Sequence, residues 1–534
     1  MTLMEKIKSK VLNMIGLAKD DNSEEQRLTF INDSERITKS RIREYNIWYY
    51  GDGDELLNFY THQNILEYNV EPYYSRNKRN YFWSISSTEG DIKRSHSGQP
   101  RNIIDTMVSI VKYPKIEATG TVLDSILKDC NFKQIYKGEQ LPLTLVEGWG
   151  CYKINWDMDV SEYPYPVYYR AENVDFVIKA GRIIGVIFKD YYTDGENRKY
   201  LLLETRSCKS LDNKRCLVIE RELFRADKAG EFITPVQDFS EVPELADMQS
   251  RVVFENMKHL FAVPCILFQN TNTSGGYGRS IFTGKTDLFD DLDQCLSQAS
   301  NTVRRSTAVE YFNSDFLERD KETGMPIQPK AYDRKYVFYE GQTSVDGSSN
   351  ASQPVQVTQP NLDFSQYSDQ AIQILMQIIN GVMSPATLGI DISKKDNAEA
   401  QREKEKVTIF TRNWIIDTET DIIKSLCEQL LCAYEYMMSG QITKFDYQIT
   451  VKYSEFADDS YENKLEKLGA AFDNSLISEK MFMDRLYGDS LSNEEYEREL
   501  NWLKKNHTEP RTEGMKGAFA GKMLGGDPNE EMEL

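Results

Sequence analysis

The sequence predicts an α+β protein, and three observations lead to that prediction. Apolar side chains recur with mainly helical spacing over the first 150 residues. From Cys151 to about Val253, alternating apolar and polar residues are interrupted by turns such as KAGR, TDGEN and DNKR, which is typical of antiparallel hairpins. Beyond Gly275, long segments have apolar residues at intervals of three and four. We therefore expect Ile31 to Gly275 to form one α+β body, from which long helices depart.

The composition is that of a folded protein. With 534 residues the chain has room for three or four domains, and its 40% hydrophobic content is ample for a packed core. No run approaches the roughly 18 apolar residues that a membrane span requires. The opening segment MTLMEKIKSKVLNMIGLAKD mixes lysines with apolar residues, so we expect an amphipathic helix and not a secretory signal. The sequence therefore predicts no membrane association.

The net charge, the cysteines and the histidines argue against several classes of function. A net charge of -20 argues against a protein that grips nucleic acid by neutralising phosphates, but it is compatible with a conduit that nucleic acid slides past. The eight cysteines include no C-x-x-C and read as reduced thiols of an intracellular protein. The four histidines are scattered, so neighbours in sequence make neither a zinc site nor a catalytic triad. We expect no metal, no cofactor and no catalytic residues.

The elements of the body follow from local signals. Asp33 can cap a helix through Tyr50, Asp52 or Asp54 can cap DELLNFYTHQNI, and Pro100 lies near the start of RNIIDTMVSIVK. Two further helical stretches are TVLDSILKDC and FKQIYKGEQLPLTLVEGWG. The predicted strands are CYKINWD, YPVYYRA, VDFVIKAGRIIGVIFKDYY, RKYLLLETR and RCLVIERELFRA.

A long amphipathic helix is predicted from Thr283 to Ser306. Its 24 residues span roughly 36 Å at the rise of an α-helix. One apolar stripe runs along it, composed of Leu288, Leu292, Cys295 or Leu296, Ala299 and Val303. The acidic residues at 287, 290, 291 and 293 point around different faces, so we expect a solvated acidic helix start and not a metal site. A rod with one apolar stripe needs neighbours to cover it.

The turn before this helix partly matches a phosphate-binding loop. Gly284, Lys285 and Thr286 fit the end of the pattern, but Arg279 occupies the first glycine position, and Gly278 is one residue too far upstream. The preceding apolar run also ends ten residues before Gly278, so no strand feeds the turn. We expect a glycine-rich turn that opens a helix; the alternative is a nucleotide-dependent enzyme that uses these three residues.

The rest of the chain alternates short strands with helices. AVEYFNSDFL and KYVFYEGQ are predicted strands, SVDGSSNASQPVQVTQPN an extended or mobile loop, and DFSQYSDQAIQILMQIING a second amphipathic helix. Gly381, Pro385 and Gly389 break the next segment, and Asp396 with Glu399 can cap a long helix to about Met438, with an apolar stripe that includes Val407, Phe410, Trp414, Leu426 and Leu430. A strand, FDYQITVKYSEF, precedes three short helices, for which Ser478 and Ser492 are suitable N-caps.

This order of elements resembles the portal, or head-tail connector, proteins of tailed bacteriophages. Three stretches carry the resemblance: GYGRSIFTGKTDLFDDLDQCLSQASN, MSPATLGIDISKKDNAEAQREKEK and NSLISEKMFMDRLYGDSLSNEEYERELNWLKK. They are similar to the start of the family's outgoing stem helix, to its loop and long kinked helix, and to its C-terminal helices. The resemblance in the order of elements covers about residues 30–506.

The resemblance implies a portal fold with a mixed wing, long stem helices, a small strand-containing clip and a helical crown, assembled as a ring of typically twelve subunits. The implied domains are an N-terminal helical arm 1–30, the wing 31–282, stem helices 283–306 and 363–381, the clip 307–362, the tunnel loop 382–396, the long wing helix and strand 397–460, the crown 461–506, and a disordered tail 507–534. Around such a ring, Leu288, Leu292, Leu296, Ala299 and Val303 would bury their stripe against neighbouring copies.

The implied function is a passive channel at the capsid portal vertex of the virion, assembled in the host cytoplasm, for packaging and ejection of double-stranded DNA. The implied partners are terminase, major capsid and scaffolding proteins, and then head-tail adaptors. Lys394 and Lys395 in the tunnel loop would line the channel and contact phosphates weakly, or they are ordinary solvated charges. The competing functions are the nucleotide-dependent enzyme and an acidic scaffold or adaptor that binds only protein.

Overall fold

The computed structural model describes two compact units, Met1–Ser454 and Glu455–Leu534, each considered by itself here. The described residues are 41–62, 81–84, 92–118, 120–211, 214–226, 232–255, 257–269, 277–305, 309–313, 319–325, 327, 335–339, 355–358, 364–390, 405–442, 447–454, 468–469, 471–472, 477–487 and 493–506. The predicted N-terminal arm, Lys394, Lys395 and the C-terminal tail lie outside them. Among the described helices, none is long and apolar enough to cross a bilayer.

Helices form the first part of the larger unit, as predicted. Residues 41–50 are helical, and the bounds of the others are α3 (Gly53–His62), α5 (Gln99–Val111), α6 (Leu123–Asp129), α7 (Phe132–Ile135), the π-helix η2 (Tyr136–Gln140) and α8 (Leu141–Glu147). Asp52 Oδ1 accepts hydrogen bonds from the backbone N–H of Asp54 and Glu55, so Asp52 is the cap of α3. Pro100 occupies the first turn of α5. The predicted cap Asp33 lies outside the described residues.

The predicted antiparallel hairpins are confirmed. Strands β4 (Val174–Lys179), β5 (Arg182–Thr193), β6 (Lys199–Leu211), β7 (Lys214–Ala226) and β8 (Phe232–Val236) form a sheet in that order, with β9 (Arg251–Phe254) also on β7. A second sheet has the order β10 (Ala262–Ile266), β2 (Trp149–Asn155), β3 (Tyr165–Arg170). β1 (Lys115–Ala118) pairs with β14 (Ile449–Lys452). Every described pair in these three sheets is antiparallel.

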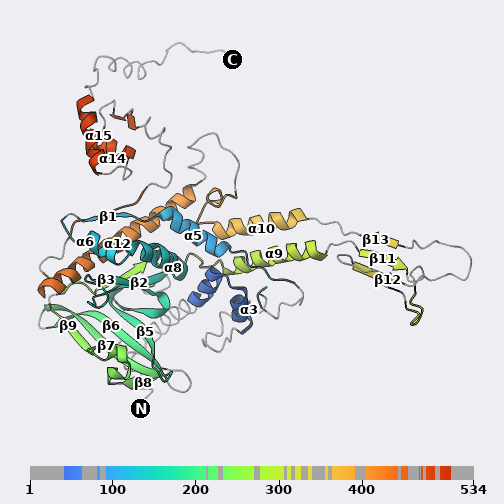
Figure 1. The fold of residues 1–534 in the computed structure, drawn as a ribbon, viewed down its shortest axis with the longest axis horizontal. Helices are drawn as coiled ribbons and strands as arrows, with labels where there is room; N and C mark the ends of the chain where they lie inside the picture. Colours follow the sequence, from blue (N-terminus) through green and yellow to red (C-terminus); the bar gives the residue numbers. More distant parts are fainter. Residues whose placement is uncertain are drawn as a thin grey trace, which may run out of the picture. The chain divides into compact units, whose positions relative to one another are not determined.

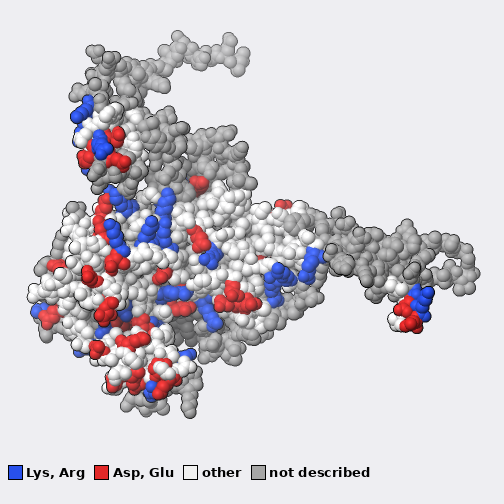
Figure 2. Space-filling view, in the orientation of Figure 1, with Lys and Arg blue, Asp and Glu red and all other residues white. Residues whose placement is uncertain are grey.

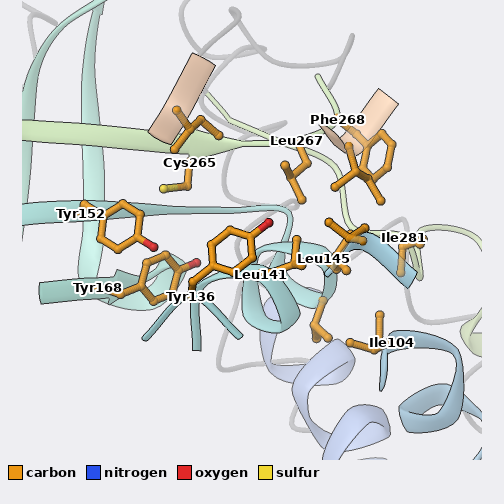
Figure 3. Packing of buried hydrophobic residues seen from close by; sticks show 14 of the residues in the cluster. Ile104, Tyr136, Leu141, Leu145, Tyr152, Tyr168, Cys265, Leu267, Phe268 and Ile281 are labelled. Carbon is orange, nitrogen blue, oxygen red and sulfur yellow. The ribbon is translucent and has the colours of Figure 1, made fainter. Parts of the chain in front are cut away.

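The main hydrophobic core lies where the helices meet the second sheet. Side chains of α5, η2, α8, β2, β3 and the turn after β10 converge there (Figure 3). Tyr136, Tyr152, Leu141 and Leu145 have no exposed surface. The long helix α12 (Lys406–Ser439) packs against β10, β2, α5 and α6 and contributes its buried face to this core.

Two helices, α9 (Thr286–Arg305) and α10 (Phe364–Ile379), lie side by side (Figure 1). We call them the helix pair. α9 begins three residues later than predicted, because Gly284 has a φ of 76° and residues 281–285 form turns. Between the two helices in sequence, β11 (Val309–Asn313) pairs in parallel with β12 (Lys335–Tyr339) and antiparallel with β13 (Val355–Thr358). β13 falls in the segment that was expected to be an extended loop.

The segment after α10 is broken as predicted. Gly381 and Gly389 have φ values of 73° and 72°, and only the short 3-10 helix η7 (Pro385–Leu388) lies between them. The predicted capping pair, Asp396 and Glu399, lies outside the described residues. The apolar residues predicted on α12 lie in two environments: Leu426 and Leu430 are buried, whereas Val407, Phe410 and Trp414 are exposed.

The second unit contains α14 (Glu479–Tyr487) and α15 (Asn493–Asn506). Met481 donates its backbone N–H to Ser478 Oγ at 3.3 Å, which confirms the predicted N-cap of α14. The predicted cap Ser492 lies outside the described residues. This unit has its own small core, formed by Phe472, Phe482, Met483, Leu486 and Leu500.

Candidate self-association site

The two ends of the helix pair that meet the body are joined by Lys285. Its Nζ donates hydrogen bonds to the carbonyl oxygens of Ile378, at 2.5 Å, and Asn380, at 3.1 Å. These carbonyls are at the C-terminal end of α10, where a cation is favoured by the helix dipole. Burial lowers the pKa of Lys285. The lysine of the partial phosphate-loop pattern is therefore engaged in holding α9 to α10.

The predicted solvated acidic start of α9 holds for Asp287 and Asp291, which are exposed, but it is wrong for Asp290 and Asp293. Asp290 and Asp293 are 5% and 0% exposed. Asp290 accepts the backbone N–H groups of Phe82 and Trp83, and Asp293 accepts the Trp83 indole N–H and the Ser97 backbone N–H. For these two residues the prediction was wrong because the donors come from a segment about 200 residues away, which helical spacing within α9 does not reveal.

The predicted stripe on α9 is divided between two environments. Leu292 and Ala299 are 2% and 6% exposed, and Leu288 is half-buried against the main core, so the chain itself covers these three. Leu296 and Val303 are 39% and 49% exposed. They are seven residues apart and therefore lie on one face of the helix. Of the five predicted residues, Leu296 and Val303 are therefore the most accessible in the described part of the chain.

The inner side of the pair is held by polar contacts as well as apolar ones. Cys295 Sγ lies 3.4 Å from the Tyr367 carbonyl oxygen, and Thr302 Oγ1 lies 3.5 Å from the Tyr367 hydroxyl. Because residue 285 meets the end of α10 while residue 302 meets its beginning, the two helices are antiparallel.

The outer side of α10 is nearly without charge, and it exposes two apolar side chains among serines and glutamines. Ile372 and Met376 are 42% and 41% exposed. Asp369 is the only charged residue between Phe364 and Ile379, and residues 294–303 of α9 contain none, although 28% of the chain is charged. Figure 2 shows acidic and basic side chains interspersed over the body, whereas the surface over α10 is largely uncharged. Depletion of charge around accessible apolar side chains is typical of the core of a protein interface.

A second accessible apolar face lies on the first half of α12. Phe410 and Trp414 are 61% and 59% exposed, and Val407 is 41% exposed. The three follow one side of the helix at intervals of three and four. The Trp414 ring lies beside that of Phe268, with centroids 5.9 Å apart. The sequence predicted these side chains as part of an apolar stripe, but periodicity gives the face of a helix and not what covers it.

The channel residues expected from the sequence, Lys394 and Lys395, are outside the described part of the chain. Thr408, on α12, binds residues that precede the segment 391–404, in which these two lysines lie. Its Oγ1 accepts the Ser384 backbone N–H at 2.8 Å and lies 2.7 Å from Thr387 Oγ1. The described residues thus fix the two flanks of this segment to each other.

Two buried polar groups in the body were not anticipated from the sequence. Glu204 contacts Arg206, Arg221 and Lys153 at 2.8, 2.7 and 3.3 Å. Glu419, on α12, accepts a hydrogen bond from Gln140 Nε2 at 2.7 Å, and burial raises its pKa to about 7. The sequence offered one signal for both: a charged residue at a position where the apolar pattern of the strand or helix predicts burial. Among the described residues, no three His, Cys, Asp or Glu side chains are grouped to hold a metal ion.

Comparisons with known proteins give little at the level of sequence. No protein-family profile matches the chain, and no curated protein matches it. The fold is similar to a chain in "Neck of native GTA particle computed with C12 symmetry", with 12% identity, a TM-score of 0.37, and 75% of this chain and 89% of the other covered. A chain in "Virion of native gene transfer agent (GTA) particle" gives 11% identity and a TM-score of 0.34, covering 75% and 89%. Because these scores are low, the functional argument rests on the residues of this chain.

Proposed function

We propose that copies of this chain assemble into a ring around a channel for double-stranded DNA at the capsid vertex of a phage-like particle. The observation that carries this proposal is the uncharged outer side of the helix pair, with Leu296, Val303, Ile372 and Met376 exposed. Exposed apolar side chains grouped on a surface with few charges mark a site where another protein binds. When copies are arranged around an axis, each helix pair is covered by a neighbouring copy. In a closed ring this contact is repeated for every subunit.

The portal resemblance of the sequence supports the rest of the assignment. In that assignment, the sheet of β11, β12 and β13 is the part of the clip that meets terminase and later the head-tail adaptor, and the ring is built with capsid and scaffolding proteins. The ring has typically twelve subunits. Its role is structural, and the energy for DNA movement comes from the separate terminase.

A nucleotide-dependent enzyme is the weaker candidate. Lys285 would have to leave the carbonyl oxygens of Ile378 and Asn380 before it could reach a phosphate, which would remove the cation from the end of α10. No other described feature favours nucleotide binding.

The assembly is tested by imaging purified protein and by measuring its mass in dilute solution. We expect wild type to form rings with a central hole, and Leu296→Ser with Val303→Ser to reduce ring formation strongly. The matched control is Met158→Ser with Val160→Ser, which removes apolar side chains that are 73% and 66% exposed outside the helix pair. Rings should persist in this control. A wild-type protein that stays monomeric at every concentration contradicts the proposal.

The channel role is tested separately with Lys394→Ala and Lys395→Ala. If these ammonium groups contact phosphates weakly as DNA passes, the double variant should assemble normally but package or retain DNA differently. Unchanged packaging and retention, with rings intact, would exclude a DNA role for this pair while leaving the ring itself standing.

A further inference from the structure

The start of α12 offers a second face for contact between copies. A closed ring needs two different faces on every copy, because each subunit meets one neighbour with one face and the other neighbour with another. The outer side of the helix pair is one such face. Val407, Phe410 and Trp414 follow one side of α12 and are exposed, so they form a candidate for the other. We call these three residues the α12 face.

The α12 face, like the outer side of the helix pair, is depleted of accessible charge. Between Val407 and Ile416 the sequence has one charged residue, Arg412, and it is 5% exposed. The Arg412 guanidinium donates to the backbone carbonyl oxygens of Ile110, at 3.0 Å, and of Ser454. Its charge is therefore used inside the body, and a molecule that covers the α12 face leaves no charge there without a partner.

Contacts within the body fix the α12 face relative to the helix pair. Thr408 Oγ1 accepts the backbone N–H of Ser384, shortly after the end of α10. The Trp414 ring lies beside Phe268, whose carbonyl oxygen accepts the Arg279 N–H at 2.8 Å, shortly before α9 begins. The two faces thus belong to one framework, as a ring with one repeated contact requires.

The charge of the chain favours a second copy as the partner of the α12 face. At a net charge of -20, copies of this chain repel one another, so they approach most easily where both surfaces lack charge. Duplex DNA binds through cations, which the α12 face does not offer. The preceding segment of the same chain, residues 391–404, is more than half charged, so its sequence is ill suited to cover three apolar side chains.

We propose that the α12 face of one copy packs against the outer side of the helix pair of the neighbouring copy, an inference that rests on the proposed ring. Phe410 and Trp414 are the anchors of this contact, since a few large side chains dominate the energy of most interfaces. About six tenths of each anchor is exposed, which leaves roughly 90–150 Å² of each to bury. The aliphatic surface that receives them consists of Leu296, Val303, Ile372 and Met376.

Two double variants, each lacking one face, test this contact. The pair variant is Leu296→Ser with Val303→Ser, and the α12 variant is Phe410→Ser with Trp414→Ser. Loss of both aromatic anchors should weaken each contact by roughly a hundredfold or more, so the α12 variant alone should form no rings. The matched control is Met438→Ser, which removes an exposed apolar side chain from the other end of α12 and should assemble as wild type does.

An equimolar mixture of the two double variants shows whether the two faces meet each other. Both faces of a contact are intact only where the helix pair of an α12 variant copy meets the α12 face of a pair variant copy. In sedimentation we therefore expect dimers that contain one copy of each variant, and no rings. Each variant by itself should remain monomeric.

The outcomes separate this inference from the proposed function. Rings formed by the α12 variant would overturn the inference and leave the proposed ring standing. A mixture that stays monomeric would overturn it too, because the two faces would then not meet each other. Wild type that forms no rings contradicts the proposed function itself. If the α12 variant does not fold, Phe410→Ser alone takes its place, since Trp414 also contacts Phe268 of its own chain.

Discussion

The body and the helix pair solve the same physical problem in opposite ways. The body encloses a large core of its own, which α12 and the sheets share, and buried Glu204 has three cationic partners there; its exposed apolar side chains include Val407, Phe410 and Trp414 at the start of α12. The helix pair covers its inner side and its end at the body, but leaves Leu296, Ile372 and Met376 exposed beside few charges. We therefore expect the body to be stable as a single chain, and the outer side of the helix pair to be covered only in the proposed ring. Substitutions in the two regions should therefore affect different measurements.

The largest effect on the stability of a single chain is expected at Glu204. Burial alone would raise the pKa of its carboxyl, but Arg206, Lys153 and Arg221 lower it far below the ordinary value. Glu204→Gln removes the anion that these cations share. Leaving buried charges without their partner costs about 3–5 kcal/mol, so the free energy of unfolding, measured with urea, should fall by that amount.

The matched control for Glu204 lies on the next strand. Glu220→Gln removes a carboxylate that contacts Lys209 at 2.9 Å at a more exposed position. Exposed pairs contribute roughly 0–1 kcal/mol, so this variant should unfold nearly as wild type does. Equal losses in the two variants would show that the body does not depend on its buried ion cluster.

Glu419 should give a smaller effect that depends on pH. Its folded-state pKa, about 7, lies above the ordinary value of 4.5, so the folded state holds the proton more tightly than the unfolded state does. Stability should fall as the pH rises from 4.5 to about 7, and an ionised Glu419 then costs up to about 3 kcal/mol, at 1.4 kcal/mol per unit. Glu419→Gln should reduce this slope in urea unfolding. Asp290 titrates in the same interval, so part of the slope remains.

Asp421→Asn is the control for Glu419, because Asp421 lies on the same helix but is exposed. It should leave the dependence of stability on pH as it is in wild type. If Glu419→Gln has no more effect on the slope than Asp421→Asn, then Glu419 is hydrated in solution and not enclosed by the core.

Much of the body could be predicted from the sequence because its signals are local. Turn residues separate the hairpins, and the caps Asp52 and Ser478 bind the backbone within three residues. The site was less predictable. Periodicity assigned Leu292 and Leu296 to one stripe, but which of them the chain covers depends on α10 and on the body. Likewise, acidic spacing alone could not reveal that Phe82, Trp83 and Ser97 donate hydrogen bonds to buried Asp290 and Asp293.

The smallest effect on the single chain is expected at Leu296, and it is the sharpest test of the contrast between the two regions. Leu296 is 39% exposed, whereas Leu292, one turn earlier, is 2% exposed. In dilute monomer, Leu296→Ala should change the free energy of unfolding by no more than about 0.5 kcal/mol, as surface substitutions usually do. Leu292→Ala should cost about 2–5 kcal/mol because it leaves a cavity. In the mass distribution of the assembled protein, Leu296→Ala should weaken the rings even though its monomer is intact. If Leu296→Ala destabilises the monomer as much as Leu292→Ala does, the chain itself covers Leu296, and the helix pair is no less self-sufficient than the body.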